Sequence, residues 1–166
     1  MSHRLATATP ADEPLLWAML FEAAHAAEQN MTTPDELRAL PELARYVEGW
    51  GRNGDLGIVG GPDGGAGAAW LRLFPADNPG YGYLDDAVPE LAIGVAPRLR
   101  GTGLGTALLR RLLTEARERY DAVSLSVRQS NPALRLYERL GFDIVAGSQV
   151  VNRVGTTSLT MVYRFR

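Results

Sequence analysis

The feature that most constrains the fold of this chain is a strand, a glycine-rich turn and a helix that follow one another between residues 90 and 119. Glu90 to Ala96 is nearly continuously apolar and has the length of a strand, which predicts a strand covered on both faces. From about 103 to 119, leucines and alanines recur at helical spacing opposite Arg and Glu, which predicts an amphipathic helix. Together these elements indicate a mixed α/β domain.

The rest of the chain adds elements of the same two kinds. Apolar runs of strand length predict further strands near 4–8, 55–60, 66–73, 123–127, 142–150 and 157–165. Capping residues followed by helical spacing predict further helices that begin near Asp12, at Thr33 and at Asn131. The helix from Thr33, where Glu36 completes a capping box, is expected to kink at Pro41. Residues 61–65 predict a hairpin turn, and the proline-rich residues 74–89 predict a long loop that is a candidate lid.

Length and composition indicate one folded domain. The chain has 166 residues, 46% hydrophobic and 22% charged, which is close to the average of globular domains, so we expect a single domain over residues 1–166. A formal net charge of −2 gives no reason to expect nucleic acid or an anionic membrane as a partner. The N-terminus lacks the apolar core of a signal peptide and the longest continuous apolar run, Leu15 to Phe21, is far too short to cross a membrane, so we expect a cytoplasmic protein.

Residue types that are missing exclude several kinds of chemistry. The chain has no cysteine, which excludes disulfides, thiol nucleophiles, iron–sulfur clusters and thiolate zinc sites. His3 and His25 are the only histidines, too few for most metal sites, so no metal is expected. All 17 basic residues are Arg, which excludes the Lys of a P-loop and the amine of a Schiff-base enzyme.

The turn from Ala96 to Thr106 has the composition of an anion site. Its glycines let successive backbone N–H groups point into one concavity, and the start of the following helix adds about half a positive charge, so a pyrophosphate would fit there. A dinucleotide fingerprint is a weak interpretation, because Thr stands at 106 and the turn follows the fourth strand instead of the first. A glycine turn that only permits tight packing is the other alternative.

Three segments carry a resemblance to a known family. The spacing Arg98-x-x-Gly101-x-Gly103 resembles the acyl-CoA-binding signature of the GNAT N-acetyltransferases. Residues 125–142, with Asn131, Leu136-Tyr137 and Gly141-Phe142, are similar to the second motif of that family, and residues 89–95 are similar to its cofactor-lining strand. The resemblance implies a GNAT fold with a mixed central sheet of about seven strands, flanked by four helices and splayed between strands four and five. It also implies acetyl-CoA as cosubstrate and no metal.

The resemblance assigns the cofactor to two stretches of backbone and a few side chains. Gly94 interrupts an apolar strand, where glycine often indicates a bulge, and the resemblance implies that such a bulge frees backbone groups for pantetheine. Asn131 before Pro132 is expected to cap a helix first and to lie near the cofactor second. The implied cofactor contacts are Ile93, Gly94, Val95, Arg98, Arg100, Gly101, Thr102, Gly103, Leu104, Gly105, Thr106 and Asn131.

Acetyl transfer to an amine needs a base for the ammonium proton and an acid for the departing thiolate. Glu90 matches the position of the family's glutamate base near the start of the fourth strand; the alternative is an exposed charge at the edge of the strand. Tyr137 matches the tyrosine that the family uses as general acid; the alternative is a core aromatic.

The acceptor is expected to be the amine of a small molecule or peptide. The implied acceptor contacts are Trp17, Phe21, Tyr83, Asp85 and Asp86, although ordinary packing and a solvated acidic loop explain the same residues. The acidic segment would attract a cationic amine. A non-catalytic acyl-CoA-binding sensor is the alternative function, and both a monomer and a homodimer agree with the sequence.

Overall fold

The computed structural model describes residues 3–61, 65–151 and 155–165. In these ranges the strands are β1 (Arg4–Thr7), β2 (Leu56–Gly61), β3 (Gly67–Arg72), β4 (Glu90–Val95), β5 (Ala122–Arg128), β6 (Asp143–Ile144), β7 (Val150–Val151) and β8 (Thr157–Arg164). The α-helices are α1 (Glu13–Ala23), α2 (Pro41–Ala44), α3 (Leu104–Ala116) and α4 (Ala133–Leu140). Short 3-10 turns occur at η1 (Pro10–Asp12), η2 (Ala26–Gln29), η3 (Pro34–Ala39) and η4 (Pro97–Leu99).

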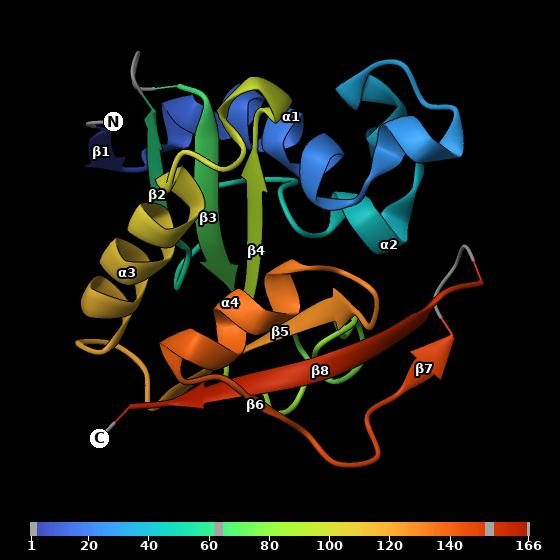
Figure 1. Cartoon of the computed structure of the whole chain (residues 1–166), viewed down its shortest axis with the longest axis vertical. Coiled ribbons are helices and arrows are strands. Elements are labelled where there is room, and N and C mark those ends of the chain that lie inside the picture. Colours follow the sequence, from blue (N-terminus) through green and yellow to red (C-terminus); the bar gives the residue numbers. More distant parts are fainter. Residues whose placement is uncertain (1–2, 62–64, 152–154, 166) are drawn as a thin grey trace. The chain divides into compact units, whose positions relative to one another are not determined.

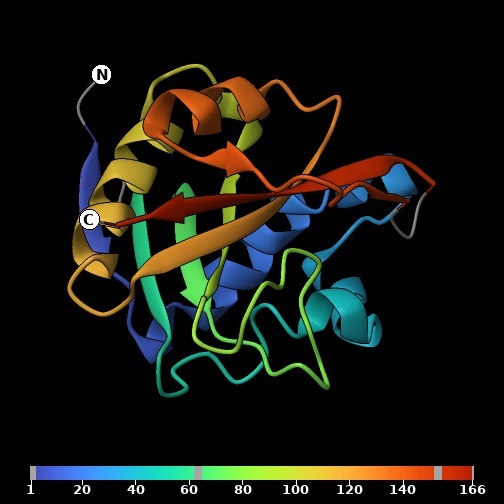
Figure 2. The same ribbon diagram turned by 90° about the horizontal axis from the view of Figure 1, so that it is seen from below.

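The elements divide into two compact units, each made of two stretches of chain. Unit 1 comprises Met1–Arg72 and Ala92–Glu115, and unit 2 comprises Leu73–Leu91 and Ala116–Arg166. Strands pair in the order β1-β2-β3-β4-β5-β8-β6, with β7 also on β8, and β4 has residues in both units. Figure 1 shows β2 beside β3 in unit 1, and Figure 2 shows β8 running along β5 in unit 2.

Unit 1 is built on an antiparallel β1-β2-β3 sheet with helices packed on it. The register runs from Arg4 opposite Gly61 to Leu56 opposite Leu71. Helix α3 turns its leucines inward, where Leu104, Leu108, Leu109 and Leu112 are at most 1% exposed. A Cβ at Gly67 on β3 would lie 3.0 Å from Leu104 Cδ2 and 3.1 Å from Leu108 Cδ1, so this glycine lets α3 lie close to the sheet.

Unit 1 contains a buried ion pair that the sequence analysis did not anticipate. The guanidinium of Arg72, at the end of β3, pairs with the carboxylate of Asp55 at 2.8 Å, and both side chains are almost fully buried. Arg72 Nη1 also donates to the carbonyl oxygens of Glu48 and Arg45, while Asp55 accepts from the Arg52 amide. Because a buried charge needs a charged or strongly polar partner, this network holds the 45–55 segment against β3.

Unit 2 is centred on β5. The start of β4 pairs in parallel with β5, with Glu90 opposite Ser124, and β8 pairs antiparallel with β5 along its whole length. Strands β6 and β7 both pair with β8. Helix α4 buries Tyr137 and ends at Gly141, whose φ of +113° is the left-handed conformation that the sequence predicts for a helix C-cap.

The predicted α/β class is confirmed, and the predicted order of strands and α-helices holds as far as α4. The sheet is mostly antiparallel, with β4 parallel to β5, and it has eight strands in the described residues where about seven were expected. The single strand predicted near 142–150 is wrong, because a turn from Val145 to Ser148, with Gly147 at φ +75°, separates β6 from β7. The predicted splay between β4 and β5 stays a prediction, and residues 62–64 of the predicted hairpin turn lie outside the described residues.

The kinked helix predicted from Thr33 is also wrong in detail. The segment forms η3 and the short α2, and Leu40 between them has extended backbone, because the ring of Pro41 disfavours a helical conformation in the residue before it. Thr33 makes no side-chain cap. The Glu36 carboxylate instead accepts from the amide and hydroxyl of Thr32, one residue earlier than predicted.

Candidate active site

The glycine turn of unit 1 lies between η4 and α3. Gly101 and Gly103 have φ values of +78° and +87°, in the left-handed region that favours glycine. A Cβ built at either position would have no heavy atom of the described residues within 4 Å. Backbone conformation, and not tight packing, therefore requires these glycines, and the space beside them is open for a ligand to approach.

The start of α3 supplies hydrogen-bond donors to this open space. The first backbone bond of the helix runs from the Ala107 amide to the Gly103 carbonyl at 3.0 Å, so the amides of Leu104, Gly105 and Thr106 have no acceptor inside the helix. The helix dipole makes this end positive. Arg98 is exposed nearby, and Arg100 is paired with Glu22 at 3.1 Å while its side chain stays 57% exposed. Donors, open space and positive charge together fit the phosphates of CoA.

The second half of β4 lies against the first turn of α3. A Cβ at Gly105 would lie 3.9 Å from both Ile93 Cδ1 and Val95 Cγ2, so the structure brings these three predicted cofactor contacts together. Gly94 has a different reason: a Cβ there would lie 2.1 Å from the Met19 carbonyl oxygen, so the glycine lets β4 pack on the backbone of α1. The bulge expected at Gly94 stays a prediction.

In unit 2, Glu90 is held beneath a loop. Its side chain is only 3% exposed, so the alternative of an exposed charge at the edge of the strand is wrong. Glu90 Oε1 accepts a hydrogen bond from the Gly82 amide at 2.9 Å, and a Cβ at Gly80 would lie 2.2 Å from the same oxygen. A Cβ at Gly82 would lie 2.7 Å from the Leu125 carbonyl carbon on β5. The two glycines therefore let residues 80–82 fit closely against Glu90 and β5.

Tyr137 is a buried side chain of α4. It is 7% exposed and makes an edge contact with the Phe142 ring at 5.8 Å between centroids. Burial raises the pKa of Tyr137 to about 12, because the phenolate would lose its hydration. The phenol therefore keeps its proton throughout the neutral range.

Asn131 has the capping role that the sequence predicts. Its side-chain oxygen accepts from the Ala133 amide at 2.9 Å at the start of α4. Its predicted place beside the cofactor stays a prediction.

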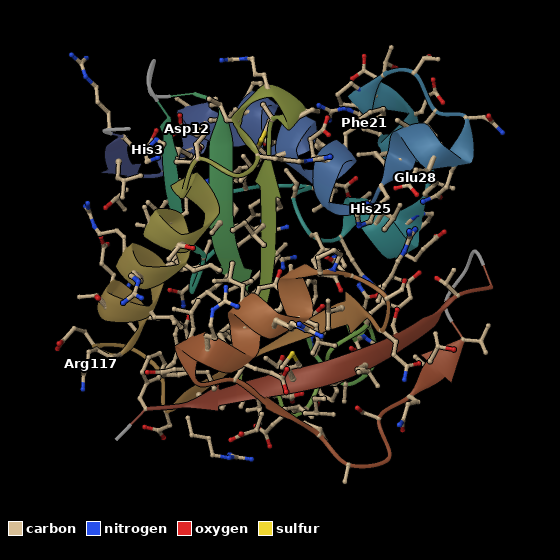
Figure 3. The ribbon with its side chains drawn as sticks, viewed as in Figure 1. His3, Asp12, Phe21, His25, Glu28 and Arg117 are labelled. Atoms are coloured by element: carbon tan, nitrogen blue, oxygen red, sulfur yellow. The ribbon has the colours of Figure 1, made fainter. Side chains whose placement is uncertain are left out.

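The predicted acceptor contacts divide between the two units. On α1, Trp17 is buried, donates to Glu13 Oε2 at 3.1 Å and is covered by the Arg38 guanidinium at 4.3 Å from the ring centroid. Phe21, one helical turn later, is half-buried (Figure 3). Trp17 therefore belongs to the packed interior of unit 1, and Phe21 has the more accessible ring.

The acidic loop of unit 2 borders a shallow surface cavity that is largely open to solvent. It has a volume of about 260 Å³ and is lined by Leu73, Phe74, Pro75 and Asp86. The Tyr83 hydroxyl donates to Asp86 Oδ1 at 2.5 Å, and this hydrogen bond raises the pKa of Tyr83 to about 12. Asp85 instead accepts from the Ala87 amide at 2.8 Å and so shapes the loop. Of the two aspartates, Asp86 is the one placed to meet a ligand in this cavity.

Several residues that hold the site were missed by sequence reasoning. Gly80 and Gly82 fix Glu90, and Leu73, Phe74 and Pro75 line the cavity. The alternation Gly80-Tyr81-Gly82 shortly before the only charge of the strand was the signal available for the first two. Within the described ranges, no group of three or more His, Cys, Asp or Glu residues could hold a metal ion. In the same ranges, none of the helices is long and apolar enough to cross a membrane.

Comparison with known proteins agrees with this geometry. The model of the Acetyltransferase (GNAT) family matches residues 17–142, and the chain belongs to that family. A mycothiol acetyltransferase of Kineococcus radiotolerans is 36% identical over 141 residues, which cover 82% of this chain and 41% of that protein. The chain thus spans about two fifths of the length of this relative.

Solved structures show the same fold. The ribosomal-protein-alanine N-acetyltransferase of Brucella melitensis superposes with a TM-score of 0.70 at 23% identity, covering 98% of this chain and 99% of that chain. An acetyltransferase structure from Salmonella typhimurium that contains acetyl-CoA superposes with a TM-score of 0.68 at 22% identity, covering 100% of this chain and 95% of that chain. The fold is therefore that of the GNAT acetyltransferases.

Proposed function

We propose that the chain is an N-acetyltransferase that moves the acetyl group of acetyl-CoA to a primary amine of a small molecule or peptide by direct attack of the amine. The observation that carries this proposal is the turn before α3. Gly101 and Gly103 are left-handed with open space beside them, and they lead into helix amides without intrahelical acceptors. Acyl-CoA phosphates are the anions that the family binds at such a turn. We also propose that the whole chain acts as one domain.

In this proposal the nitrogen loses two protons and the sulfur gains one. When bound, acetyl-CoA supplies the acetyl group as a thioester; the amine nitrogen forms the new bond to carbon, and the bond to sulfur breaks. Glu90 takes the proton that the ammonium must lose before it can attack. Tyr137 gives its hydroxyl proton to the departing thiolate, and the second proton that the nitrogen loses after its attack restores the Tyr137 hydroxyl. With a pKa of about 12, the phenol has its proton at neutral pH, although the raised pKa makes it a weaker acid than an ordinary tyrosine.

The proposed acceptor is cationic and carries an apolar portion. Asp86 would face the ammonium group, and Leu73, Phe74 and Pro75 would contact the apolar portion in the cavity of unit 2. The similar proteins are named for different acceptors. The Kineococcus radiotolerans relative is named a mycothiol acetyltransferase, and the Brucella melitensis structure is named a ribosomal-protein-alanine N-acetyltransferase. They define a panel of amines to test and do not select one.

The sensor alternative has one observation in its favour. Glu90 is almost fully buried, and one of its oxygens already accepts from Gly82, which a purely structural carboxylate would also do.

Thiol release from acetyl-CoA separates the two functions. The protein is mixed with acetyl-CoA and, in turn, a peptide with an N-terminal alanine, a polyamine and the acceptor of the mycothiol acetyltransferases, with a mixture lacking amine as the control. We expect thiol release that depends on one of the amines and falls sharply in Glu90→Gln at saturating acceptor. CoA binding without release for any amine would establish the sensor instead.

A further inference from the structure

The start of the chain contacts the glycine turn from a distance of 99 residues in sequence. The His3 ring Nε2 lies 3.2 Å from the backbone carbonyl oxygen of Thr102, which stands between Gly101 and Gly103. A carbonyl oxygen only accepts hydrogen bonds, so Nε2 carries the proton and donates it. Nδ1 of the same ring is buried and has no hydrogen-bond partner in the described part of the chain. The ring is therefore oriented by the turn and not by a partner on its other side.

A second contact connects β1, the strand that directly follows His3, to the far end of α3. The Thr7 hydroxyl donates to Glu115 Oε1 at 3.2 Å, and Glu115 is also paired with Arg111 one turn earlier. Two contacts thus connect this N-terminal segment to the region of α3: His3, just before β1 (Figure 3), contacts the turn that precedes the helix, and Thr7 at the end of β1 contacts Glu115 near the end of the helix. Hydrogen bonding of β1 to β2 holds the strand itself in the sheet.

The other hydrogen bonds of Thr102 are local. The Thr102 amide and hydroxyl both donate to the Leu99 carbonyl, at 3.3 Å and 2.6 Å. Such bonds within four residues keep the turn curled but do not hold it against the rest of unit 1. Gly101 and Gly103 add no packing there, because open space lies beside them in the described structure. Two side-chain contacts connect the turn to distant segments: Arg100 pairs with Glu22 of α1 at 3.1 Å, and His3 contacts Thr102 between the two left-handed glycines.

We propose that His3 is a positioning residue for the acyl-CoA turn, an inference that rests on the proposed function of that turn. By holding the Thr102 carbonyl, His3 keeps the neighbouring amides in the arrangement that receives the phosphates. Without that bond the turn samples other conformations that do not bind CoA. The apparent affinity for CoA is then the intrinsic affinity multiplied by the fraction of molecules in the binding conformation. The loss of one such bond corresponds to about a three- to tenfold rise in the dissociation constant.

The test compares two replacements of His3. His3→Gln keeps an N–H donor at a similar reach, and His3→Phe keeps the ring without a donor. We expect the dissociation constant for CoA, measured by calorimetry, to stay within about twofold in the Gln variant and to rise about three- to tenfold in the Phe variant. In turnover, KM for acetyl-CoA should rise in the Phe variant while kcat and the acceptor KM stay near wild type. Thr7→Val, which loses only the contact at the far end of α3, serves as the comparison.

Two results would overturn the inference. One is unchanged CoA affinity in His3→Phe, with or without a loss in His3→Gln, which would mean that the ring packs and does not donate; the other is an equal loss of affinity in both variants, which would mean that the N–H donor is not what matters. Hydrogen exchange of the amides of residues 101–105 in the ligand-free protein is an independent measurement, and it should be faster in His3→Phe than in His3→Gln. If wild type fails to bind CoA but this exchange difference appears, the proposed function is wrong and the positioning of the turn by His3 still holds.

Discussion

The two units hold their candidate groups in opposite ways. In unit 1 the cofactor turn is exposed, and it offers backbone amides whose direction depends on two left-handed glycines, Gly101 and Gly103. In unit 2 the candidate base and acid are side chains, and both are buried, Glu90 to 3% and Tyr137 to 7% exposure. The candidate cofactor turn of unit 1 is thus made of backbone that a ligand can reach, and the candidate base and acid of unit 2 are side chains that the interior of that unit surrounds.

This difference determines which kind of substitution the glycine turn of unit 1 and the buried side chains of unit 2 can each tolerate. A backbone site depends on conformation and open space, so an added side chain is harmful even where nothing in the protein is displaced. A buried side-chain site depends on the residues packed around it, so a methyl group added to a neighbouring residue in space can disturb it.

Gly103→Asn should give the largest effect. Asn tolerates a left-handed backbone better than other side chains, so the fold should survive, but the new side chain occupies the open space at the turn. We expect CoA affinity to fall at least about a hundredfold by calorimetry, and the stabilisation by excess CoA, about 2.7 kcal/mol at a hundred times the dissociation constant, to disappear. Gly147→Asn is the matched control, because Gly147 has φ +75° and similarly open surroundings in unit 2. Equal CoA affinity in the two variants would contradict the assignment of the turn.

Tyr137→Phe tests the acid without removing the ring. It should lower kcat by about one to three orders of magnitude and leave CoA affinity nearly unchanged, as expected for a positioned proton donor. Turnover is measured at saturating concentrations of both substrates. Wild-type turnover in this variant would make Tyr137 a core aromatic, which is the alternative that the sequence left open.

The same variant has a consequence for stability at high pH. The pKa of Tyr137 is about 12 in the folded protein and about 10 in the unfolded chain, so between these values the unfolded chain releases a proton that the folded protein keeps. Stability from this group is complete below pH 10 and declines as the pH rises toward 12, by up to about 1.4 kcal/mol per pH unit. Denaturant unfolding of wild type should lose stability more steeply in this window than that of Tyr137→Phe. Parallel curves would mean that the hydroxyl is not desolvated.

Gly80→Ala disturbs Glu90 without changing it. The added Cβ would lie 2.2 Å from Glu90 Oε1, so the carboxylate must move away from the Gly82 amide. If Glu90 is the base, kcat should fall about tenfold, in the range of a misplaced catalytic group, and the acidic limb of the pH profile should shift. Gly65→Ala is the control, because a Cβ there has no described atom within 4 Å. An unchanged pH profile in Gly80→Ala would count against Glu90 as the base.

The smallest effect is expected from Asp86→Asn. If Asp86 attracts a cationic acceptor, its loss should raise the acceptor KM about three- to tenfold at low salt, with kcat unchanged and the difference reduced by added salt. Asp85→Asn is the comparison, because Asp85 is engaged with the Ala87 amide and Asn keeps an acceptor oxygen there. A salt-independent loss of kcat in Asp86→Asn would indicate that the catalytic base is Asp86 in the loop and not Glu90.

Much of the fold was predictable from local patterns. The strand over Glu90–Val95, the amphipathic helix α3 and the C-cap at Gly141 each depend on residues within one element, and each was confirmed. The failures lie where a single residue interrupts a pattern. Pro41 splits a predicted helix into η3 and α2, and Gly147 divides a predicted strand into β6 and β7.

By itself, the sequence determined the α/β class, the membership in the GNAT family and the glycine turn between a strand and a helix, because element type depends mainly on neighbouring residues. Tertiary structure alone decided the burial of Glu90 under residues 80–82, the raised pKa of Tyr137 and the contact between His3 and Thr102. These properties depend on which distant segments meet, because desolvation and long-range hydrogen bonds exist only after the chain has packed.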